Sequence, residues 1–383
     1  MRFRHPDGSI VHLAYCTNLH PAEDLEGVIS QLARFAAPAR EALEVPFLGV
    51  GLWLPAVLAA RLVGERAALE RLREALDTLR LEVVTFNGFP YRAFHAPVVK
   101  HRVYRPDWTE PERLRYTLNL AELASKLLPS SAAEATISTL PFGWRRGWTA
   151  QHDISARQAL QALREGLDRL SDVSARRVRV GIEPEPGCAL ETTRQAAEAL
   201  ADFEGDELGI CLDACHLAVQ FEDAGEALGT LAAASVPIVK TQVSAAVRSA
   251  PSDVARLARF TEPRYLHQTR ERLPNGEIAG VDDLPQALSG ELPGEGEWRV
   301  HFHVPVHADG GDTTQPQLLA VLAAALGGPV PVTHHVEVET YTWTVLPYDD
   351  RPKDDEGLTD GIVRELDWTR QRLLDLGLEG VAG

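Results

Sequence analysis

Short apolar segments recur along the chain and alternate with longer segments of helical periodicity. Eight of the short segments have the apolar and β-branched content of strands, at residues 12–17, 47–53, 82–87, 135–140, 177–183, 208–213, 237–243 and 333–340. Between most of them, apolar residues recur every three or four positions, as in ISARQALQALREGLDRL. Strand and helix in eight successive units predict an α/β fold, a (β/α)8 TIM barrel. An open doubly wound sheet is the competing arrangement, but no GxGxxG motif follows the first strand.

The segment between the seventh and eighth predicted strands is too long for a simple repeat. Residues 249–331 contain a helix-like run, a Pro274-Asn275-Gly276 turn signal and the strand-like sequence EWRVHFHVPVH. We therefore expect an inserted β-hairpin or small sheet within a single barrel that spans residues 1–383. A last helix over residues 356–375 is expected to close the barrel.

Composition narrows the classes of function. The formal net charge of -17 argues against a nucleic-acid partner, because phosphate binding depends on Lys and Arg. No apolar run reaches the roughly 18 residues of a membrane span, and the start of the chain lacks the apolar core of a signal peptide. We expect a cytoplasmic protein with four reduced cysteines and a small-molecule substrate.

Two acids end neighbouring predicted strands. In VRVGIE, large apolar residues alternate with polar or small ones and the strand ends at Glu183. In LGICLD the same alternation ends at Asp213, and His216 follows three residues later. Because the carboxyl ends of barrel strands carry the chemistry of this fold, we expect both carboxylates at one rim.

The last two predicted strands add polar side chains to the interior. Val239, Thr241 and Val243 form the helix-facing side of strand seven, which leaves Lys240 and Gln242 pointing inward. In strand eight Glu337 and Glu339 point inward in the same way. A buried lysine needs a counter-charge, and Glu337 is the candidate at a similar depth.

Glu183, Asp213, Gln242 and Glu339 are thus expected to converge. Converging carboxylates repel one another unless a cation lies between them, so we expect a divalent metal ion. An oxygen-rich ligand set favours manganese, magnesium or cobalt. Any one of these acids, taken alone, is more typical of a cap or a salt bridge, and only their coincidence at corresponding strand ends favours a metal site.

Histidines in the inserted segment form a second group of donors. His301, His303 and His307 alternate with apolar residues and share one face as far as the strand continues, although Pro305 interrupts it. At the barrel mouth these imidazoles could complete the metal shell, bind a second metal ion such as zinc or iron, or contact an anionic substrate. We expect His303 first, and His267 second, as metal ligands. The alternative is a polar outer face on which the histidines have no specific role.

The strand-end residues resemble those of the xylose-isomerase-like superfamily of sugar and sugar-phosphate isomerases and epimerases. The resemblance implies metal ligands Glu, Asp, His and Glu on strands five to eight, and Glu183, Asp213 and Glu339 match three of them. Gln242 stands at the histidine position, where an amide is a weaker ligand, so either the metal affinity is lower or an inserted histidine such as His303 replaces it. The same resemblance implies that His216 and Arg248 contact the substrate.

Short motifs over nearly the whole chain resemble the EboE family, a set of barrel proteins associated with metabolite traffic. They are YCTNLHP, NGFPYRAFH, VYRPDW, ISTLPFGW, IEPEPG, LDACH, TQVSAA, YLHQTR, HFHVPVH and VETYTW. The resemblance implies an isomerase-type fold in a pathway that moves or processes a secondary metabolite.

An epimerase-type reaction assigns roles to these residues. Glu183 and Glu339 would act as base and acid on the two faces of a substrate carbon, with His216 holding a substrate oxygen. The other expected substrate contacts are Arg248, Lys240, Asn18, His20, Asn87, Trp53 and Tyr91. Two other functions remain open: a carrier that binds a metabolite without turning it over, and a zinc-dependent phosphoesterase.

Overall fold

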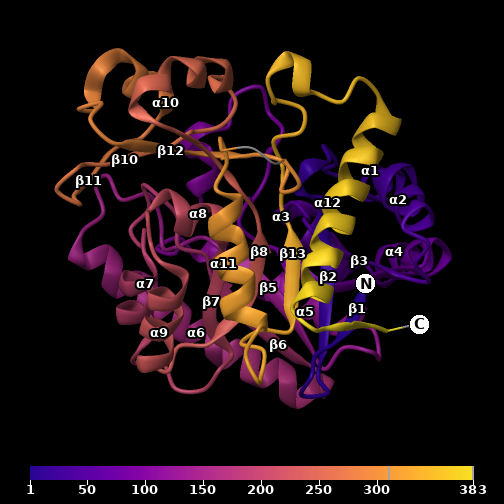
Figure 1. Ribbon diagram of the computed structural model, residues 1–383. Coiled ribbons are helices and arrows are strands. Elements are labelled where there is room, and N and C mark those ends of the chain that lie inside the picture. Colours follow the sequence, from indigo (N-terminus) through magenta and orange to yellow (C-terminus); the bar gives the residue numbers. More distant parts are fainter. Residues whose placement is uncertain (309–310, 382–383) are drawn as a thin grey trace.

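The computed structural model describes residues 1–308 and 311–381. They form a closed barrel of parallel strands with helices around it (Figure 1). The last barrel strand, β13 (His335–Val338), pairs with the first, β2 (Ile10–Cys16), and this pairing closes the barrel. Between them lie β3 (Leu48–Leu52), β4 (Leu81–Asn87), β5 (Glu134–Thr139), β6 (Arg177–Ile182), β7 (Leu208–Asp213) and β8 (Ile238–Val243). The predicted (β/α)8 barrel is confirmed. Short strands β1 (Arg2–Arg4) and β14 (Glu379–Gly380) extend the sheet beside β2.

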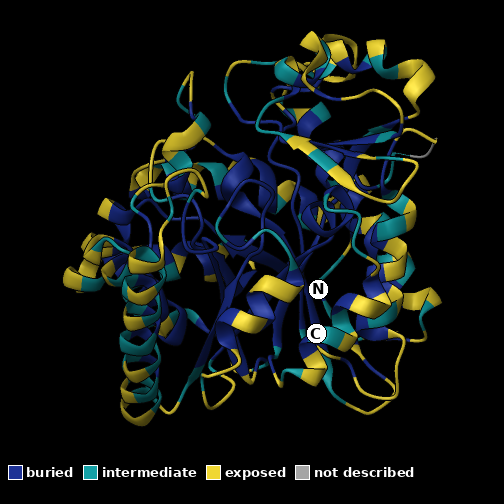
Figure 2. Ribbon diagram, turned by 90° about the vertical axis from the view of Figure 1, so that its left-hand side faces the viewer, coloured by how far each residue is buried: buried dark blue, intermediate teal, exposed yellow. Residues whose placement is uncertain are grey.

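Helices surround the barrel, bury their apolar faces and leave their outer faces exposed (Figure 2). In α6 (Ala150–Ser174), Ala156, Leu160, Leu163 and Leu167 recur at helical spacing and are all buried. The other helices are α1 (Leu25–Gln31), α2 (Ala37–Ala42), α3 (Ala56–Gly64), α4 (Arg66–Leu79), α5 (Pro111–Leu127), α7 (Thr193–Leu200), α8 (Ala214–Val219), α9 (Ala224–Ala233), α10 (Leu284–Gln286), α11 (Gln315–Leu326) and α12 (Asp355–Asp375). Among the described residues, no helix has the length and hydropathy needed to cross a membrane.

A fully buried ion pair joins two neighbouring strands inside the barrel. Lys240 on β8 contacts Glu337 on β13, as the alternation along both strands predicts, and neither side chain is exposed. A Cβ atom at Gly51, on β3, would lie 1.4 Å from Glu337 Oε1. Because Lys240 holds that carboxylate through Oε2, a side chain at position 51 would have to disturb the buried ion pair, which favours glycine there.

A second, antiparallel sheet lies across one end of the barrel (Figure 1). Its strands, in the order β11, β10, β12 and β9, are Ile278–Val281, Thr269–Arg272, Glu297–His303 and Ala246–Ser249. The predicted turn joins β10 to β11, and Gly276 in it has a φ of 88° that favours glycine. Since β12 ends at His303, the regular alternation stops before His307.

Candidate functional site

Asp213 ends β7 and also caps the helix that follows. Its Oδ1 accepts hydrogen bonds from the backbone N–H of His216 at 2.8 Å and from Ser244 Oγ at 2.9 Å. This N-cap fixes the carboxylate and places His216 on the first turn of α8. The spacing of three residues between Asp213 and His216 therefore has a local structural cause.

The structure brings Glu183, Asp213 and Glu339 together. All three are buried, and one carboxylate oxygen of each lies within 4.8 Å of the others. Glu183 follows β6 and Glu339 follows β13, so the carboxylates come from separate strand ends. Asn18 and Asn87 donate side-chain amide hydrogens to Glu339 Oε1, at 2.6 and 2.8 Å, and these bonds orient that carboxylate.

Several buried ligand atoms at this rim have no hydrogen-bond partner within the described structure. They are Glu183 Oε2, Asp213 Oδ2, His303 Nε2 and both amide atoms of Gln242. Gln242 lies in register with Asp213 on β7 and Glu337 on β13. An unpaired buried polar atom costs about 1–3 kcal/mol, so a group of them requires an explanation. Carboxylate oxygens and an imidazole nitrogen are ligands for a divalent cation, and the residues present fit such an ion.

His303 has the orientation of a metal ligand. Its Nδ1 donates to the backbone carbonyl of Glu339 at 2.7 Å, which leaves the Nε2 lone pair available. Nε2 is buried and unpaired, and a ring nitrogen of His303 lies within 4.8 Å of ligand atoms of Asp213 and His216. The inserted sheet therefore brings His303 close to Asp213, which is paired in register with Gln242 on β8.

Burial and, after it, repulsion between neighbouring charges raise the pKa values of Glu183 and Glu339. Burial, followed by the charges of Glu339 and Asp213, raises the pKa of Glu183 well above its ordinary value. Burial and then the Asp213 charge raise the pKa of Glu339 to about 8. A cation between the carboxylates would remove this cost and favour their ionised forms.

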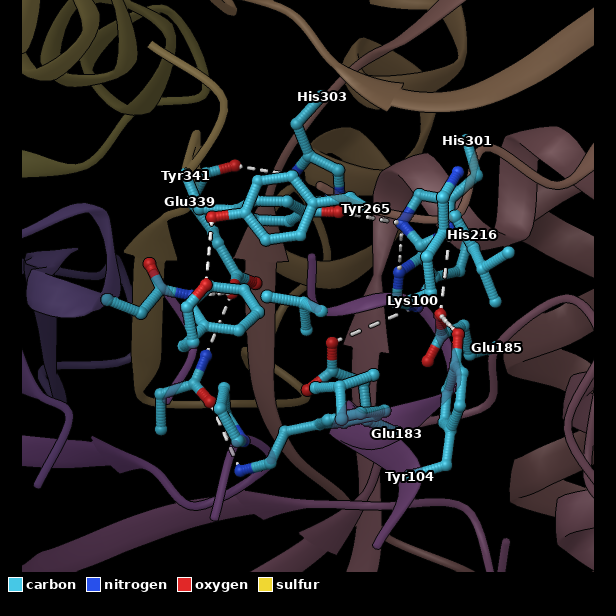
Figure 3. Close-up of a pocket in the computed structure, with 18 residues that line it drawn as sticks. Lys100, Tyr104, Glu183, Glu185, His216, Tyr265, His301, His303, Glu339 and Tyr341 are labelled. Carbon is cyan, nitrogen blue, oxygen red and sulfur yellow. Dashed lines mark hydrogen bonds and ion pairs between the residues drawn. The ribbon is translucent and has the colours of Figure 1, made fainter. Parts of the chain in front are cut away.

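A second group of donors lies beside the carboxylates (Figure 3). His216 Nε2 faces His301 Nε2 at 3.1 Å, and Glu185 is within reach of both histidines. Tyr104 Oη donates to Glu185 Oε1 at 2.7 Å, and Gln268 Nε2 donates to the same oxygen at 3.1 Å. Burial raises the pKa of Glu185 to about 8 and lowers the pKa of His216 to about 4.

Members of both groups line one cavity: Glu183, Glu339 and His303, and Glu185, His216 and His301. Aromatic and aliphatic side chains form most of its wall: Phe89, Pro90, Phe94, Val99, Val103, Tyr104, Tyr265, Leu266 and Tyr341. Among the described lining residues, Lys100 is the one lysine or arginine, and its Nζ is 2.5 Å from Asp283 Oδ2 in the inserted segment. The cavity thus combines a polar floor with an apolar wall.

Arg248 and Lys240 lie outside the cavity, contrary to their expected roles in substrate binding. After β8 the chain leaves the barrel as β9, which pairs with β12 and carries Arg248 away from the cavity. There Arg248 Nε donates to the Gly311 carbonyl at 2.8 Å. Lys240 is held inside the barrel by Glu337, where the cavity does not reach it.

Three further expected substrate contacts also pack elsewhere. The His20 ring stacks on Phe35 with centroids 4.6 Å apart, because the chain turns outward after β2. Trp53 does not line the cavity, and its Nε1 donates to the Pro90 carbonyl at 2.8 Å. Tyr91 packs edge-on against Tyr116 with centroids 5.2 Å apart. Asn18 and Asn87, in contrast, line the cavity as expected.

His267 does not join the carboxylates of Glu183, Asp213 and Glu339. Its Nε2 contacts Glu262 at 2.9 Å and its Nδ1 contacts the His301 carbonyl at 3.1 Å, so both ring nitrogens are engaged. Burial with two partners makes His267 a support for β12 in this structure.

Sequence reasoning missed Glu185, Tyr104, Tyr341 and the role of His301. Glu185 follows Glu183 by two residues in IEPEPG, and this repeat of acid and proline was the available signal. His301 shares the alternation that singled out His303. Tyr104 ends the short 3-10 helix Lys100–Tyr104 and Tyr341 lies in a turn after β13, so no periodicity marks these side chains as ones that line the cavity.

Comparison with known proteins gives the family of this barrel. A family model described as a xylose isomerase-like TIM barrel matches residues 39–268, which is more than half of the chain. The chain belongs to the xylose isomerase-like TIM-barrel family. A comparison with curated protein sequences gives no significant match.

Solved structures show the same family fold at low sequence identity. A putative sugar phosphate isomerase/epimerase from Anabaena variabilis is 13% identical with a TM-score of 0.51, covering 96% of this chain and 100% of the other. The probable 3-DHS dehydratase AsbF from Bacillus anthracis is 13% identical with a TM-score of 0.50, covering 94% and 98%. D-psicose 3-epimerase from Clostridium cellulolyticum is 12% identical with a TM-score of 0.49, covering 95% and 99%. These likenesses concern the fold alone.

Proposed function

We propose that this protein is a divalent-metal-dependent isomerase or epimerase acting on a sugar-like or hydroxy-carbonyl metabolite. The observation that carries the proposal is the set of buried, unpaired ligand atoms Glu183 Oε2, Asp213 Oδ2 and His303 Nε2. Glu183, Asp213, Glu339 and His303 would hold the ion. Their oxygen-rich character favours manganese, magnesium or cobalt, and His303 also makes zinc or iron suitable.

The protein's own carboxylates would move the proton. A bound metal ion would supply Lewis acidity that polarises the carbonyl and hydroxyl oxygens of the substrate. Glu183 would hold the ion through Oε2, and its other carboxylate oxygen, Oε1, would remove the proton from the carbon beside the carbonyl. Glu339, oriented by Asn18 and Asn87, would return a proton to that carbon or its neighbour. One proton leaves and one is returned, so the step needs no oxidant or reductant.

The family membership and the motifs support a finer assignment. The resemblance of IEPEPG, LDACH and HFHVPVH to EboE proteins supports placement in that family and a substrate from secondary metabolism. We include in the proposal that residues 249–331 work as part of one unit with the barrel, because this segment supplies His301 and His303 to the cavity. The apolar wall would pack against the carbon skeleton of the substrate.

Exchange of a carbon-bound hydrogen with solvent deuterium tests the proposal. The protein is freed of metal, reloaded with manganese and incubated in heavy water with a set of ketoses, aldoses and other hydroxy-carbonyl compounds. We expect deuterium incorporation into at least one compound, and loss of at least about 100-fold with Glu183→Gln. Arg248→Ala, which lies outside the cavity, is the matched control. Absence of exchange with every compound in the metal-loaded protein would contradict the reaction class.

Histidine nitrogens favour a second candidate, a zinc-dependent phosphoesterase. His216, His301 and His303 bring three imidazoles to one side of the cavity, and nitrogen donors suit zinc. The zinc-loaded protein would then hydrolyse p-nitrophenyl phosphate and show no deuterium exchange. Tight binding of a metabolite without either reaction would instead indicate a carrier.

A further inference from the structure

Glu365 is a buried acid on α12 that the proposed reaction does not use. It does not line the cavity, and its hydrogen bonds reach the two chain segments that carry His303 and Glu339. Burial raises the pKa of Glu365 to about 7, so an ionised carboxylate at this place costs stability. The groups bonded to it show what it holds.

Three donors converge on this carboxyl group. The backbone N–H of Val306, beyond the end of β12, donates to Glu365 Oε1 at 3.1 Å, and Thr340 Oγ1 donates to the same oxygen at 2.6 Å. Trp343 Nε1 donates to Oε2 at 3.0 Å. Val306 belongs to the inserted segment, whereas Thr340 and Trp343 follow β13. One carboxyl group thus joins α12 to the inserted segment and to the chain after the last barrel strand.

Gly361 fits the same face of α12 to Trp343. It lies four residues before Glu365, so the two positions are neighbours on one face of the helix. A Cβ atom at position 361 would lie 2.6 Å from Cη2 of the Trp343 ring. The helix therefore provides space for the indole at one position and an acceptor for the indole N–H at the other.

The two segments bonded to Glu365 are also bonded to each other. His303 Nδ1 donates to the Glu339 carbonyl at 2.7 Å, and Thr342 Oγ1 donates to the His303 carbonyl. Val306 lies three residues after His303, and Thr340 directly follows Glu339. A shift of either segment away from α12 would therefore move one of these two candidate ligands relative to the other.

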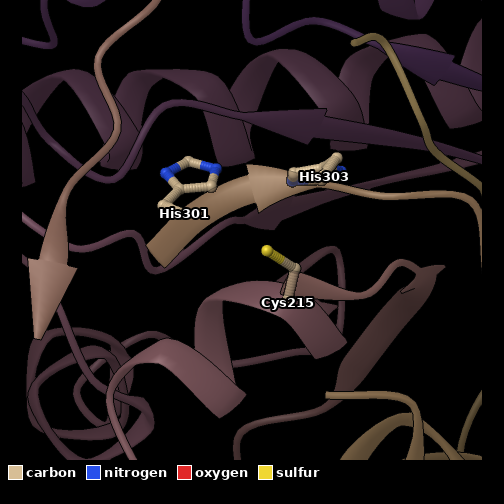
Figure 4. Close-up of side chains that lie close together, drawn as sticks. All are labelled: Cys215, His301 and His303. Carbon is tan, nitrogen blue, oxygen red and sulfur yellow. The ribbon is translucent and has the colours of Figure 1, made fainter. Parts of the chain in front are cut away.

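Cys215 lies beside β12 but does not orient His303 by a hydrogen bond (Figure 4). Its thiol points from α8 toward the strand, and its sulfur lies within 4.8 Å of one ring nitrogen each of His301 and His303. Among the described residues, no hydrogen bond joins this thiol to either ring. The hydrogen bond that orients the His303 ring is therefore the one to the Glu339 carbonyl, in a segment that Glu365 holds.

We propose that Glu365 is a positioning residue for the metal centre, which fixes His303 relative to Glu339 without touching the ion or the substrate. The inference rests on the proposed metal centre, but not on which reaction that centre performs. Replacing an outer hydrogen-bonding partner of a metal ligand typically lowers metal affinity by about 10–100-fold. Glu365 acts through one further bond, so we expect an effect at the lower end of this range.

Manganese affinity tests the inference. The full chain is stripped with a chelator and titrated with manganese, and electron paramagnetic resonance measures the free ion. We expect Kd to rise by about tenfold in Glu365→Gln, because the amide N–H of Gln meets the Trp343 N–H where the carboxylate accepted it. The double variant Glu365→Gln/Trp343→Phe removes this conflict and keeps an oxygen for Val306 and Thr340. Its Kd should return to within about threefold of the wild-type value.

Glu271→Gln is the matched control. Glu271 on β10 is also fully buried, and it accepts three backbone N–H groups from residues 294–296, next to the start of β12 and at the opposite end of that strand from His303. Urea denaturation of the metal-free proteins should show lower stability in both Gln variants. Manganese binding should weaken in Glu365→Gln alone.

Thr340→Val provides a milder test if Glu365→Gln does not fold, because it removes one donor and keeps the carboxyl group. We expect its Kd for manganese to rise by about threefold. An unchanged Kd in the folded Glu365 and Thr340 variants would overturn the inference, as would an equal loss of affinity in Glu271→Gln. A wild-type chain that binds no manganese would overturn the proposed metal centre together with this inference, so the two failures are distinguishable. Deuterium exchange does not enter these outcomes.

Discussion

Two layers of the barrel interior differ in how their buried charges are arranged: one pairs opposite charges, and the other brings like charges together. In the inner layer Lys240 and Glu337 form an ion pair with both side chains fully buried. In the outer layer, at the strand ends, the carboxylates of Glu183, Asp213 and Glu339 lie close together, and Glu183 Oε2 and Asp213 Oδ2 have no hydrogen-bond partner among the described residues. Each charge of the inner pair faces an opposite charge, whereas the outer layer places like charges beside one another.

The pKa values of Lys240 in the inner layer and Glu339 in the outer layer show the same difference. Burial alone would lower the pKa of Lys240, but the Glu337 carboxylate raises it above its ordinary value, so the ion pair keeps its charges. Burial and the neighbouring Asp213 raise the pKa of Glu339 to about 8, so the carboxylate resists ionisation. Buried charge at the strand ends thus costs stability, which is typical of a functional site.

Breaking the inner pair should have the largest effect. Lys240→Met leaves Glu337 buried without a partner, and we expect a loss of about 3–5 kcal/mol in the free energy of unfolding. Urea denaturation followed by circular dichroism measures it. The double variant Lys240→Met/Glu337→Gln removes both charges and should recover much of the loss. A cost below about 1 kcal/mol for the single variant would show that the inner layer does not depend on this pair.

Raising the pH should lower the stability of the metal-free protein, because Glu339 in the outer layer ionises. The pKa of Glu339 is about 8 in the fold against an ordinary value of 4.5, so its contribution to stability is complete below about pH 4.5. It is lost as the pH rises through about 8, and we expect a fall of a few kcal/mol across this window. Thermal unfolding in the presence of a chelator measures the fall.

Manganese or zinc should oppose this loss. Ionised carboxylates bind the ion, so the stabilisation by added metal should grow as the pH rises, reaching about 2.7 kcal/mol at a free metal concentration of 100 times Kd. A metal-free protein that is more stable at about pH 8 than at about pH 5 would contradict the described electrostatics.

Removing one rim carboxylate should have a smaller and opposite effect. Glu339→Gln keeps an oxygen that Asn18 and Asn87 can bind and removes a repelling charge. We expect the metal-free protein to gain about 1–2 kcal/mol near pH 8, by chelator-treated thermal unfolding. Stabilisation by manganese should disappear in the same variant. A destabilised metal-free variant would mean that the carboxylate is held for structural reasons.

A change outside both layers should have the smallest effect. Arg248→Ala removes a partly exposed guanidinium that contacts Gly311 and Glu297, and we expect stability to change by no more than about 0.5–1 kcal/mol. The manganese-dependent rise in Tm should match the wild type. A large loss of that response would mean that Arg248 contributes to the metal-binding site, contrary to its position outside the cavity.

The barrel and its rim acids could be predicted because they depend on local periodicity. Alternation along short runs located the eight strands, and the position of Glu183 and Asp213 at strand ends was enough to place them at one rim. The pairing of Lys240 with Glu337 followed from the same alternation and the cost of an unpaired buried charge.

Residues whose position depends on how distant segments pack could not be placed this way. Arg248 follows β8 closely in sequence, but the pairing of β9 with β12 takes it away from the cavity. The facing of His216 and His301 depends on how β12 packs over the barrel mouth, and no periodicity contains that contact. A short 3-10 helix and a turn bring Tyr104 and Tyr341 to the cavity, and no periodicity marks them either.

Gly51 has a consequence for any attempt to redesign this barrel. A Cβ atom at this position would occupy the place of Glu337 Oε1, and Glu337 is held there by Lys240. Positions 51, 240 and 337 should therefore tolerate substitution together and not one at a time, although they lie on three strands. A library that randomises them singly should return the parent residues, whereas joint randomisation should also recover sets with a larger residue at 51 and an uncharged pair. Such compensated sets would offer a way to alter the inner layer while the metal-binding rim above it is left in place.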